Sequence, residues 1–188
     1  MALEVDIMPN MKITVTKLTT PDLARLACQY TMHSHAASTI TLDKLYAMEH
    51  SPIRTQIFAV EMQEIPNFVS VHFVRHHVGV VDHYCQTMRV DRGADEIANR
   101  MTPTNHLMIA NAQALINMAR KRLCHKASPE TRDVMSAIRA SMFGADPDLA
   151  SVMVPECYYR GFICHERAMC GLQPSVKHYL ETWAWYGE

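Results

Sequence analysis

The chain has 188 residues, of which 48% are apolar and 20% charged, and its formal net charge is −1. This length and composition suit one globular domain with a substantial core. The near-neutral charge gives no sign of a basic surface for nucleic acid or of a polybasic membrane surface. No apolar run reaches the roughly eighteen residues of a membrane-spanning helix, so no membrane contact is expected.

The first residues, MALEVDIMPNMKITV, are acidic where a secretory signal would be basic. We therefore expect a cytoplasmic protein, in the host cytoplasm if it is viral. In that compartment its six cysteines are expected as thiols or ligands rather than disulfides. One domain is expected over residues 1–188, with a flexible start at 1–11 and a C-terminal tail at 173–188.

Helix starts are predicted wherever Ser, Thr or Asp precedes Pro. There are five such positions: Thr20, Ser51, Thr102, Ser128 and Asp146. Alternating Val and Thr predict a strand at 12–18, and a helix should follow Pro21 through residue 34. The segment 55–65 also alternates and predicts a strand that Pro66 ends, whereas the Val-rich segment from Asn67 fits either structure.

The clearest predicted helix is TNHLMIANAQALINMARKRLCHK, residues 104–126, and another follows over 129–143. The first half of 104–126 is apolar almost all round, which indicates burial in a large core or between subunits. One face would carry Asn111, Leu115, Met118, Arg122 and His125, with Asn117 on a different face. The mixture of elements indicates an α+β fold.

The segment FVSVHFVRHHVGVVDHYCQTMR, residues 68–89, places many polar side chains in an apolar run. Such groups must be hydrogen-bonded, bind a ligand or face water. Three interpretations stay open: an anion cradle built on His72, Arg75 and His76, a salt-bridged surface patch, or a metal site. The metal site would use His72, His76, His83 and Cys85.

Two later segments also carry polar groups that need an explanation. Asn111, Asn117 and Arg122 lie on the helix expected to be buried, so a ligand's phosphate or base edge, or the backbone of a neighbouring subunit, would have to be their partner. In PECYYRGFICHERAMCG the cysteines Cys157, Cys164 and Cys170 lack the tight spacing of a zinc finger. Packed or surface thiols are favoured there over a structural metal, and no metal is expected.

Taken together, these segments resemble the flavin-dependent thymidylate synthases, in a divergent, phage-like form. The resemblance covers about residues 12–172. Pro66-Asn67-Phe68-Val69 stands nine residues before Arg75, as it does before that family's Arg-His-Arg-x-x-Ser signature, and Ser51-Pro52 matches an upstream Ser/Thr-Pro motif. The family's helix motif and its continuation are matched by Asn111, Leu115, Asn117, Arg122, Ala127, Glu130 and Arg132.

The sequence also departs from that family at the positions that would contact ligands. The third signature residue is His77 instead of Arg, and Val80 replaces the Ser. Asp82 and His83 replace an Asn-Glu pair, and Cys85 replaces a later Ser. The other departures are His72 for Gln, Thr87 for Arg with Arg89 two residues further on, Arg54 for Glu, and Glu49 for an upstream His.

The resemblance implies a single-domain fold with a mixed sheet and long buried helices, assembled as a homotetramer with shared active sites. It implies reductive one-carbon transfer from methylenetetrahydrofolate to C5 of deoxyuridine monophosphate (dUMP), with FAD reduced by NADPH. The flavin-binding residues implied are Ser51, Arg75, His76, His77, Asn111 and Asn117. The nucleotide pocket implied comprises His72, Asp82, His83, Cys85, Arg89 and Arg122, with Arg122 also catalytic because it would polarise the pyrimidine ring.

Two further functions stay open beside this one. The pocket could accept deoxycytidine monophosphate (dCMP), or install a hydroxymethyl group, because the Asp82 carboxylate accepts hydrogen bonds from an amino group. Alternatively the chain binds a nucleotide without catalysis. Cys85 is expected to line the pocket as a small apolar residue. Its alternative role is that of a nucleophile favoured by His83 or Arg89, which burial among Val80, Val81 and Tyr84 would oppose.

Overall fold

The computed structural model describes residues 10–33 and 38–171, which form an α+β structure around one hydrophobic core. Its sheet has four strands in the order β1-β2-β4-β3. The strands are β1 (Lys12–Lys17), β2 (Ile57–Pro66), β3 (Val80–Cys85) and β4 (Pro103–Asn111). Every neighbouring pair runs antiparallel, so the expected mixed sheet is wrong.

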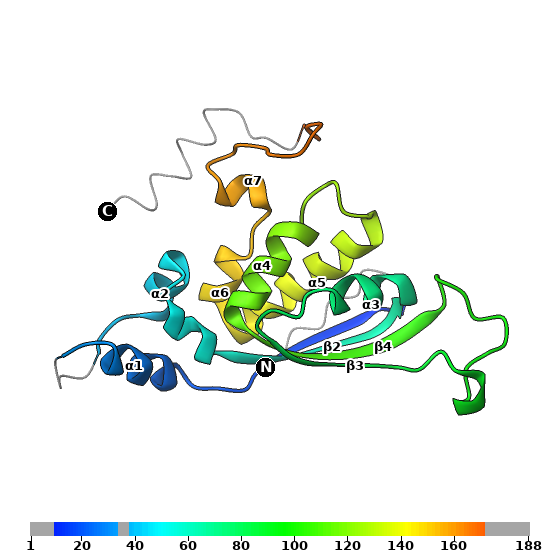
Figure 1. Cartoon of the computed structure of the whole chain (residues 1–188), viewed down its shortest axis with the longest axis horizontal. Coiled ribbons are helices and arrows are strands. Elements are labelled where there is room, and N and C mark those ends of the chain that lie inside the picture. Colours follow the sequence, from blue (N-terminus) through cyan, green and yellow to red (C-terminus); the bar gives the residue numbers. More distant parts are fainter. Residues whose placement is uncertain (1–9, 34–37, 172–188) are drawn as a thin grey trace.

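The helices gather mainly on one side of this sheet, as Figure 1 shows for α3 to α6. Helix α5 packs on β1 and β2, and α3 packs on β2 and β4. In chain order the α-helices are α1 (Pro21–Tyr30), α2 (Leu42–Met48), α3 (Asn67–Val74), α4 (Ala112–Arg122), α5 (Pro129–Ala145), α6 (Pro147–Val152) and α7 (Glu156–Tyr159). Two short 3₁₀ helices are η1 (Ser51–Thr55) and η2 (Val90–Arg92).

Four of the five predicted helix starts begin helical turns. Helices α1, α5 and α6 and the 3₁₀ helix η1 each have Pro in their first turn. The fifth prediction, at Thr102, is wrong because Pro103 opens strand β4. The strands predicted at 12–18 and 55–65 are confirmed as β1 and β2. The ambiguous segment from Asn67 contains both structures: helix α3 first and strand β3 after it.

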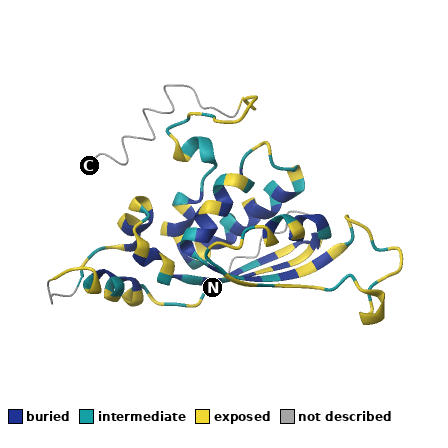
Figure 2. Ribbon diagram, viewed as in Figure 1, coloured by how far each residue is buried: buried dark blue, intermediate teal, exposed yellow. Residues whose placement is uncertain are grey.

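The helix predicted over 104–126 is wrong in its first half. That half is strand β4, in which Thr104, His106, Met108 and Ala110 are buried and the residues between them are more open (Figure 2). This alternation of buried and more open residues is expected for a strand in a sheet that is covered on one face. Helix α4 begins only at Ala112, and the Asn111 side chain caps it by accepting from the amide of Ala114.

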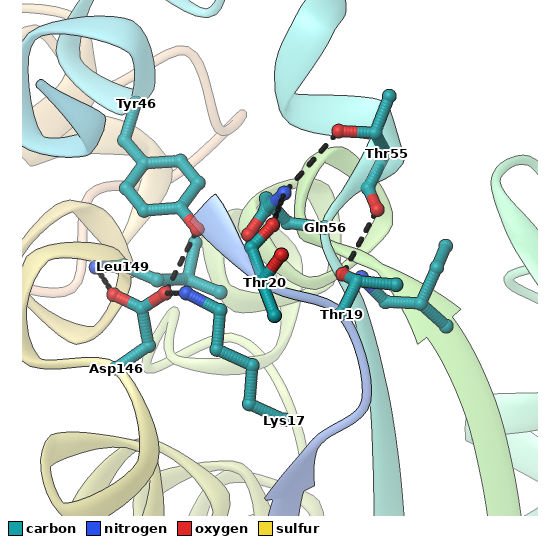
Figure 3. Close-up of polar contacts among 9 residues, drawn as sticks. Lys17, Thr19, Thr20, Tyr46, Thr55, Gln56, Asp146 and Leu149 are labelled. Carbon is teal, nitrogen blue, oxygen red and sulfur yellow. Dashed lines mark hydrogen bonds and ion pairs between the residues drawn. The ribbon is translucent and has the colours of Figure 1, made fainter. Parts of the chain in front are cut away.

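A buried carboxylate, that of Asp146, joins β1 and α2 to the start of α6 (Figure 3). Asp146, only 4% exposed, accepts from Lys17 Nζ at 2.7 Å and from Tyr46 Oη at 2.9 Å. It also caps α6 by accepting from the amide of Leu149. Burial and the nearby Asp146 raise the pKa of Tyr46, so its hydroxyl stays a donor. This group ties β1, α2 and α6 together.

The flexible start expected at 1–11 and the tail expected at 173–188 lie mostly outside the described residues, because 1–9 and 172–188 are not described. Of the expected flexible start, Met11 is described and is fully buried. Across residues 10–33 and 38–171, no helix has both the length and the apolar character needed to cross a membrane.

Candidate functional site

The side chain of Arg122 joins the end of α4 to the segment after α3. Its Nε–H donates to Nε2 of His76 at 2.9 Å, and its Nη2 donates to the carbonyl of His72, also at 2.9 Å. These contacts bridge residues 46 and 50 positions apart in the chain. The two segments that suggested a ligand site therefore meet at one guanidinium group.

The backbone between α3 and β3 is held against α4 by a glycine. Gly79 has a φ of +79°, and its carbonyl accepts from the Asn111 amide at 3.0 Å. A Cβ on Gly79 would lie 2.8 Å from Oδ1 of Asn111, which leaves no room for a side chain. The glycine thus allows the His76 segment to lie beside the start of α4.

A cavity of about 500 Å³ opens at the other end of α4. His76 and Arg122 line it, together with residues that follow α4 and residues of α7 and the segment after it. The cationic members are Arg120, Lys121, Arg122, Lys126 and Arg160, against the carboxylates Glu156 and Glu166. Glu156 pairs with Lys121 and Arg160, and Glu49 pairs with Arg120. Arg122 has no carboxylate partner in the described part of the chain, so the cavity offers an uncompensated positive charge.

The histidines of this site are held neutral. Burial, then the charge of Arg122, lowers the pKa of His76 to about 4. Because Arg122 donates to its Nε2, His76 carries its proton on Nδ1. Burial and Arg122 also lower the pKa of His72, whose Nδ1 lies 2.8 Å from Oγ1 of Thr131. The site therefore keeps one strong cation, Arg122, beside neutral rings.

A second group of polar side chains runs from β3 across β4 to α3. Nδ1 of His83 lies 2.9 Å from Nε2 of His106, and Nδ1 of His106 lies 3.0 Å from Oγ of Ser70. Ser70 Oγ in turn lies 3.4 Å from Sγ of Cys85. At the other end, Nε2 of His83 donates to the carbonyl of His76 at 3.2 Å. This second group thus reaches the Arg122 site through the backbone of His76.

The structure brings together only part of the residues implied by the resemblance. His72, His76, Arg122, His83 and Cys85 belong to the two groups just described. The others lie apart within one chain: Arg75, His77, Asp82 and Asn117 are exposed, Asn111 caps α4, Arg89 pairs with Asp91, and Ser51 lines a different cavity beside His50. The expectation that Asn111 and His125 share one helix face with Arg122 is wrong. Asn111 precedes α4 and His125 follows it.

The metal and surface-patch interpretations of this segment find no support. Among residues 10–33 and 38–171, no three His, Cys, Asp or Glu side chains are placed to hold a metal ion. No described carboxylate pairs with Arg75 or Arg122, as a salt-bridged patch would require. Cys157, Cys164 and Cys170 line the cationic cavity together with Cys124, all as free thiols.

The expected burial of Cys85 is wrong. Val81 and Tyr84 are 68% and 56% exposed, and Cys85 itself is exposed on the edge strand β3. The geometry leaves Cys85 open to solvent on one side and connected to Ser70 on the other.

Sequence reasoning missed Ser70 and His106, which lie between His83 and Cys85 in the second group. His106 was assigned to a helix, and only its place in a strand opposite Cys85 makes it a neighbour of β3. It also missed Lys126 and Arg160, which reach the cavity from elements far apart in the chain. Interpreting residues 103–111 with the two-residue period of a strand would have placed His106 on the buried face of a sheet.

A scan against models of known protein families finds no match for this chain. A search of curated proteins likewise finds no similar sequence.

Proposed function

We propose that the chain catalyses flavin-dependent reductive one-carbon transfer from methylenetetrahydrofolate to C5 of dUMP, as the resemblance implies. The observation that carries the proposal is the convergence of Arg122 with His72 and His76. Those residues come from the two motifs on which the resemblance depends, and their contacts measure 2.9 Å.

Arg122 is suited to a nucleotide because much of its donor capacity is free. A guanidinium group has five N–H donors in a planar fork, and the described contacts occupy Nε and one position on Nη2. The remaining donors can bind a phosphate or a pyrimidine carbonyl. A cation at the carbonyl would stabilise the negative charge that develops when C5 becomes nucleophilic.

The residues present also fit a flavin at its phosphates. Arg75 and His77 are exposed, and Arg75 has no carboxylate partner among the described residues. An exposed guanidinium of this kind binds diphosphate oxygens well. When bound, reduced flavin supplies the hydride, while this chain's side chains bind and orient the nucleotide.

The proposal includes assembly into a homotetramer. Within one chain Ser51 and Arg122 line different cavities, so a site that uses both needs residues of a second subunit. Exposed apolar side chains on the edge strand, Val81 and Tyr84, offer area for such a contact.

The test is a purification followed by an assay. The protein should show a flavin absorption spectrum, elute as a tetramer, and convert dUMP to its 5-methyl product with methylenetetrahydrofolate and NADPH, as followed by mass spectrometry. Parallel reactions with dCMP identify an altered specificity. Purification without flavin, and with no flavin binding on addition of FAD, would overturn the proposal.

A further inference from the structure

We propose that Cys124 and Cys157 are a redox-active pair of thiols that regulates the cavity containing Arg122. Oxidation by a peroxide would join them in a disulfide that links the end of α4 to α7, and a thiol reductant would reverse it. Formation of the bond stands on the structure alone. Its effect on nucleotide binding rests on the proposed function, because the nucleotide is placed at Arg122.

Four of the six cysteines of the chain line this one cavity. One of them lies just after α4, and the other three lie in α7 and the segment that follows it. The four are Cys124, Cys157, Cys164 and Cys170. The remaining two, Cys28 and Cys85, belong to α1 and β3. The segment PECYYRGFICHERAMCG, for which the proposed function has no role, therefore brings three thiols to the same cavity as Cys124.

The pair lies where α7 packs on the C-terminal turn of α4. In that contact Nζ of Lys121 lies 3.5 Å from Oε2 of Glu156. Cys157 follows Glu156 directly, and Cys124 follows Lys121 by three residues, which is about one helical turn. The ion pair therefore holds the backbone of the two cysteines on either side of one contact between α4 and α7.

The two thiols also influence each other electrostatically. Burial raises the pKa of the Cys157 thiol, and the thiols of Cys124 and Cys170 act in the same direction. Such charge interactions weaken with distance and with screening by solvent. Because Cys124 has the larger influence of the two, we assign it as the partner of Cys157. Cys170 is then the competing partner that an experiment has to exclude.

The oxidation balances with hydrogen peroxide as the oxidant. The thiolate of Cys124 attacks one peroxide oxygen, the O–O bond breaks, and the sulfur becomes a sulfenic acid while water leaves. The thiol of Cys157 then attacks that sulfur, so that the S–S bond forms, the S–O bond breaks and a second water carries away its proton. Two thiols are oxidised and one peroxide is reduced to two waters. Cys157 is assigned the second step because burial raises its pKa.

The disulfide would change the cavity because both cysteines line it. A disulfide requires the two Cα atoms to lie within about 4.4–6.8 Å of each other, so it fixes α7 against the residues that follow α4. Arg122 lines the same cavity two residues before Cys124. We therefore expect the oxidised cavity to be narrower beside Arg122 and its affinity for a nucleotide to be lower.

The first experiment maps the disulfide. Fully reduced protein is treated with hydrogen peroxide, the remaining thiols are blocked with iodoacetamide, and the peptides are analysed by mass spectrometry without reduction. We expect one disulfide, between Cys124 and Cys157, whereas Cys28 and Cys85 should be recovered without a link. The absence of a disulfide, or a disulfide that joins Cys157 to Cys170 instead, would overturn the pairing.

Two variants test the assignment of the partner. Cys124→Ser should leave Cys157 without a link, whereas Cys170→Ser, which removes an exposed thiol of the same cavity, should leave the disulfide intact. A cross-link between residues 124 and 157 restricts the unfolded chain, so oxidation should raise the unfolding temperature of the wild type by about 5 °C or more and leave that of Cys124→Ser unchanged. If Cys157 is linked to the same extent in Cys124→Ser, the assigned partner is wrong. An unchanged unfolding temperature in cross-linked wild type would show that the bond distorts the fold, and would contradict a built-in pair.

The second experiment separates this inference from the proposed function. Isothermal titration calorimetry measures dUMP affinity for the reduced protein, for the oxidised protein and after treatment with dithiothreitol. Oxidation should weaken binding at least about ten-fold, the reductant should restore it, and Cys124→Ser should bind dUMP equally before and after peroxide. If the disulfide forms and the affinity is unchanged, the regulatory role is wrong. If the reduced protein does not bind dUMP, the proposed function fails, and the peptide map decides by itself whether the pair exists.

Discussion

Arg122 and His76, 46 residues apart in sequence, share one hydrogen bond in which Nε–H of the arginine donates to Nε2 of the histidine. The bond fixes the histidine tautomer, and the described contacts leave Nη1 and one hydrogen of Nη2 of the arginine without a protein acceptor. Substitution of Arg122 therefore tests most directly whether this site binds a nucleotide.

Replacing Arg122 by Lys should weaken dUMP binding about 10- to 100-fold, because a single ammonium cannot reproduce a bidentate, charge-assisted contact. Isothermal titration calorimetry measures the affinity, and the flavin spectrum should stay unchanged. The control is Lys121→Ala, which removes an exposed charge of the same cavity that is already paired with Glu156. Equal losses in both variants would mean that the cavity acts only through its overall charge.

Replacing Arg75 by Ala should lower flavin affinity by a similar factor, since one charge-assisted phosphate contact contributes about 1.5–3 kcal/mol. The amount of flavin that copurifies, measured by absorbance per chain, reports the change. The control is Arg25→Ala, which removes a partly exposed arginine that pairs with Asp22 and is distant in sequence from the site. Undiminished flavin in Arg75→Ala would show that this residue does not hold the cofactor.

Stability should fall as the pH drops from about 6.5 toward about 4. His76 and His106 have pKa values lowered to about 4 in the folded protein, so over this range only the unfolded chain takes up their protons. Urea denaturation at several pH values measures the effect. His76→Asn keeps an acceptor for Arg122 but cannot titrate, so its profile should be flatter. A wild-type profile that is already flat would contradict the assignment of buried neutral rings.

Gly79→Ala should destabilise the protein more than Gly93→Ala. Both glycines have a positive φ, so both substitutions strain the backbone by about 1–2 kcal/mol. A Cβ at Gly79 would also meet Asn111, whereas one at Gly93 has nothing within 4 Å. Thermal unfolding of the two variants isolates the contact, and a larger loss in Gly93→Ala would argue against the close approach.

Asp146→Ala should destabilise the fold by about 3–5 kcal/mol, because it leaves Lys17 and Tyr46 without their buried partner. Asp148→Ala is the control, since that carboxylate is exposed and its loss should stay within about 0.5 kcal/mol. Chemical denaturation gives both values. Near-equal effects would mean that the buried group contributes little to holding β1 against α6.

The sequence alone determined the elements whose signals are local. Pro after Ser, Thr or Asp marks the starts of α1, α5 and α6, because its fixed φ suits a first helical turn. Alternating β-branched residues mark β1 and β2, and the motif order located His72, His76 and Arg122 as candidates. None of these inferences needed knowledge of a distant part of the chain.

Tertiary structure decided what depends on neighbours remote in sequence. Residues 103–111 are apolar enough for a helix, but pairing with both β2 and β3 makes them a central strand whose alternate side chains are buried. That pairing brings His106 opposite Cys85, and packing of α3 then brings Ser70 to both. Hydrogen bonds between side chains of three different elements produce no recognisable spacing in the sequence. Each of these bonds depends on how the elements pack, not on how far apart the residues are in the chain.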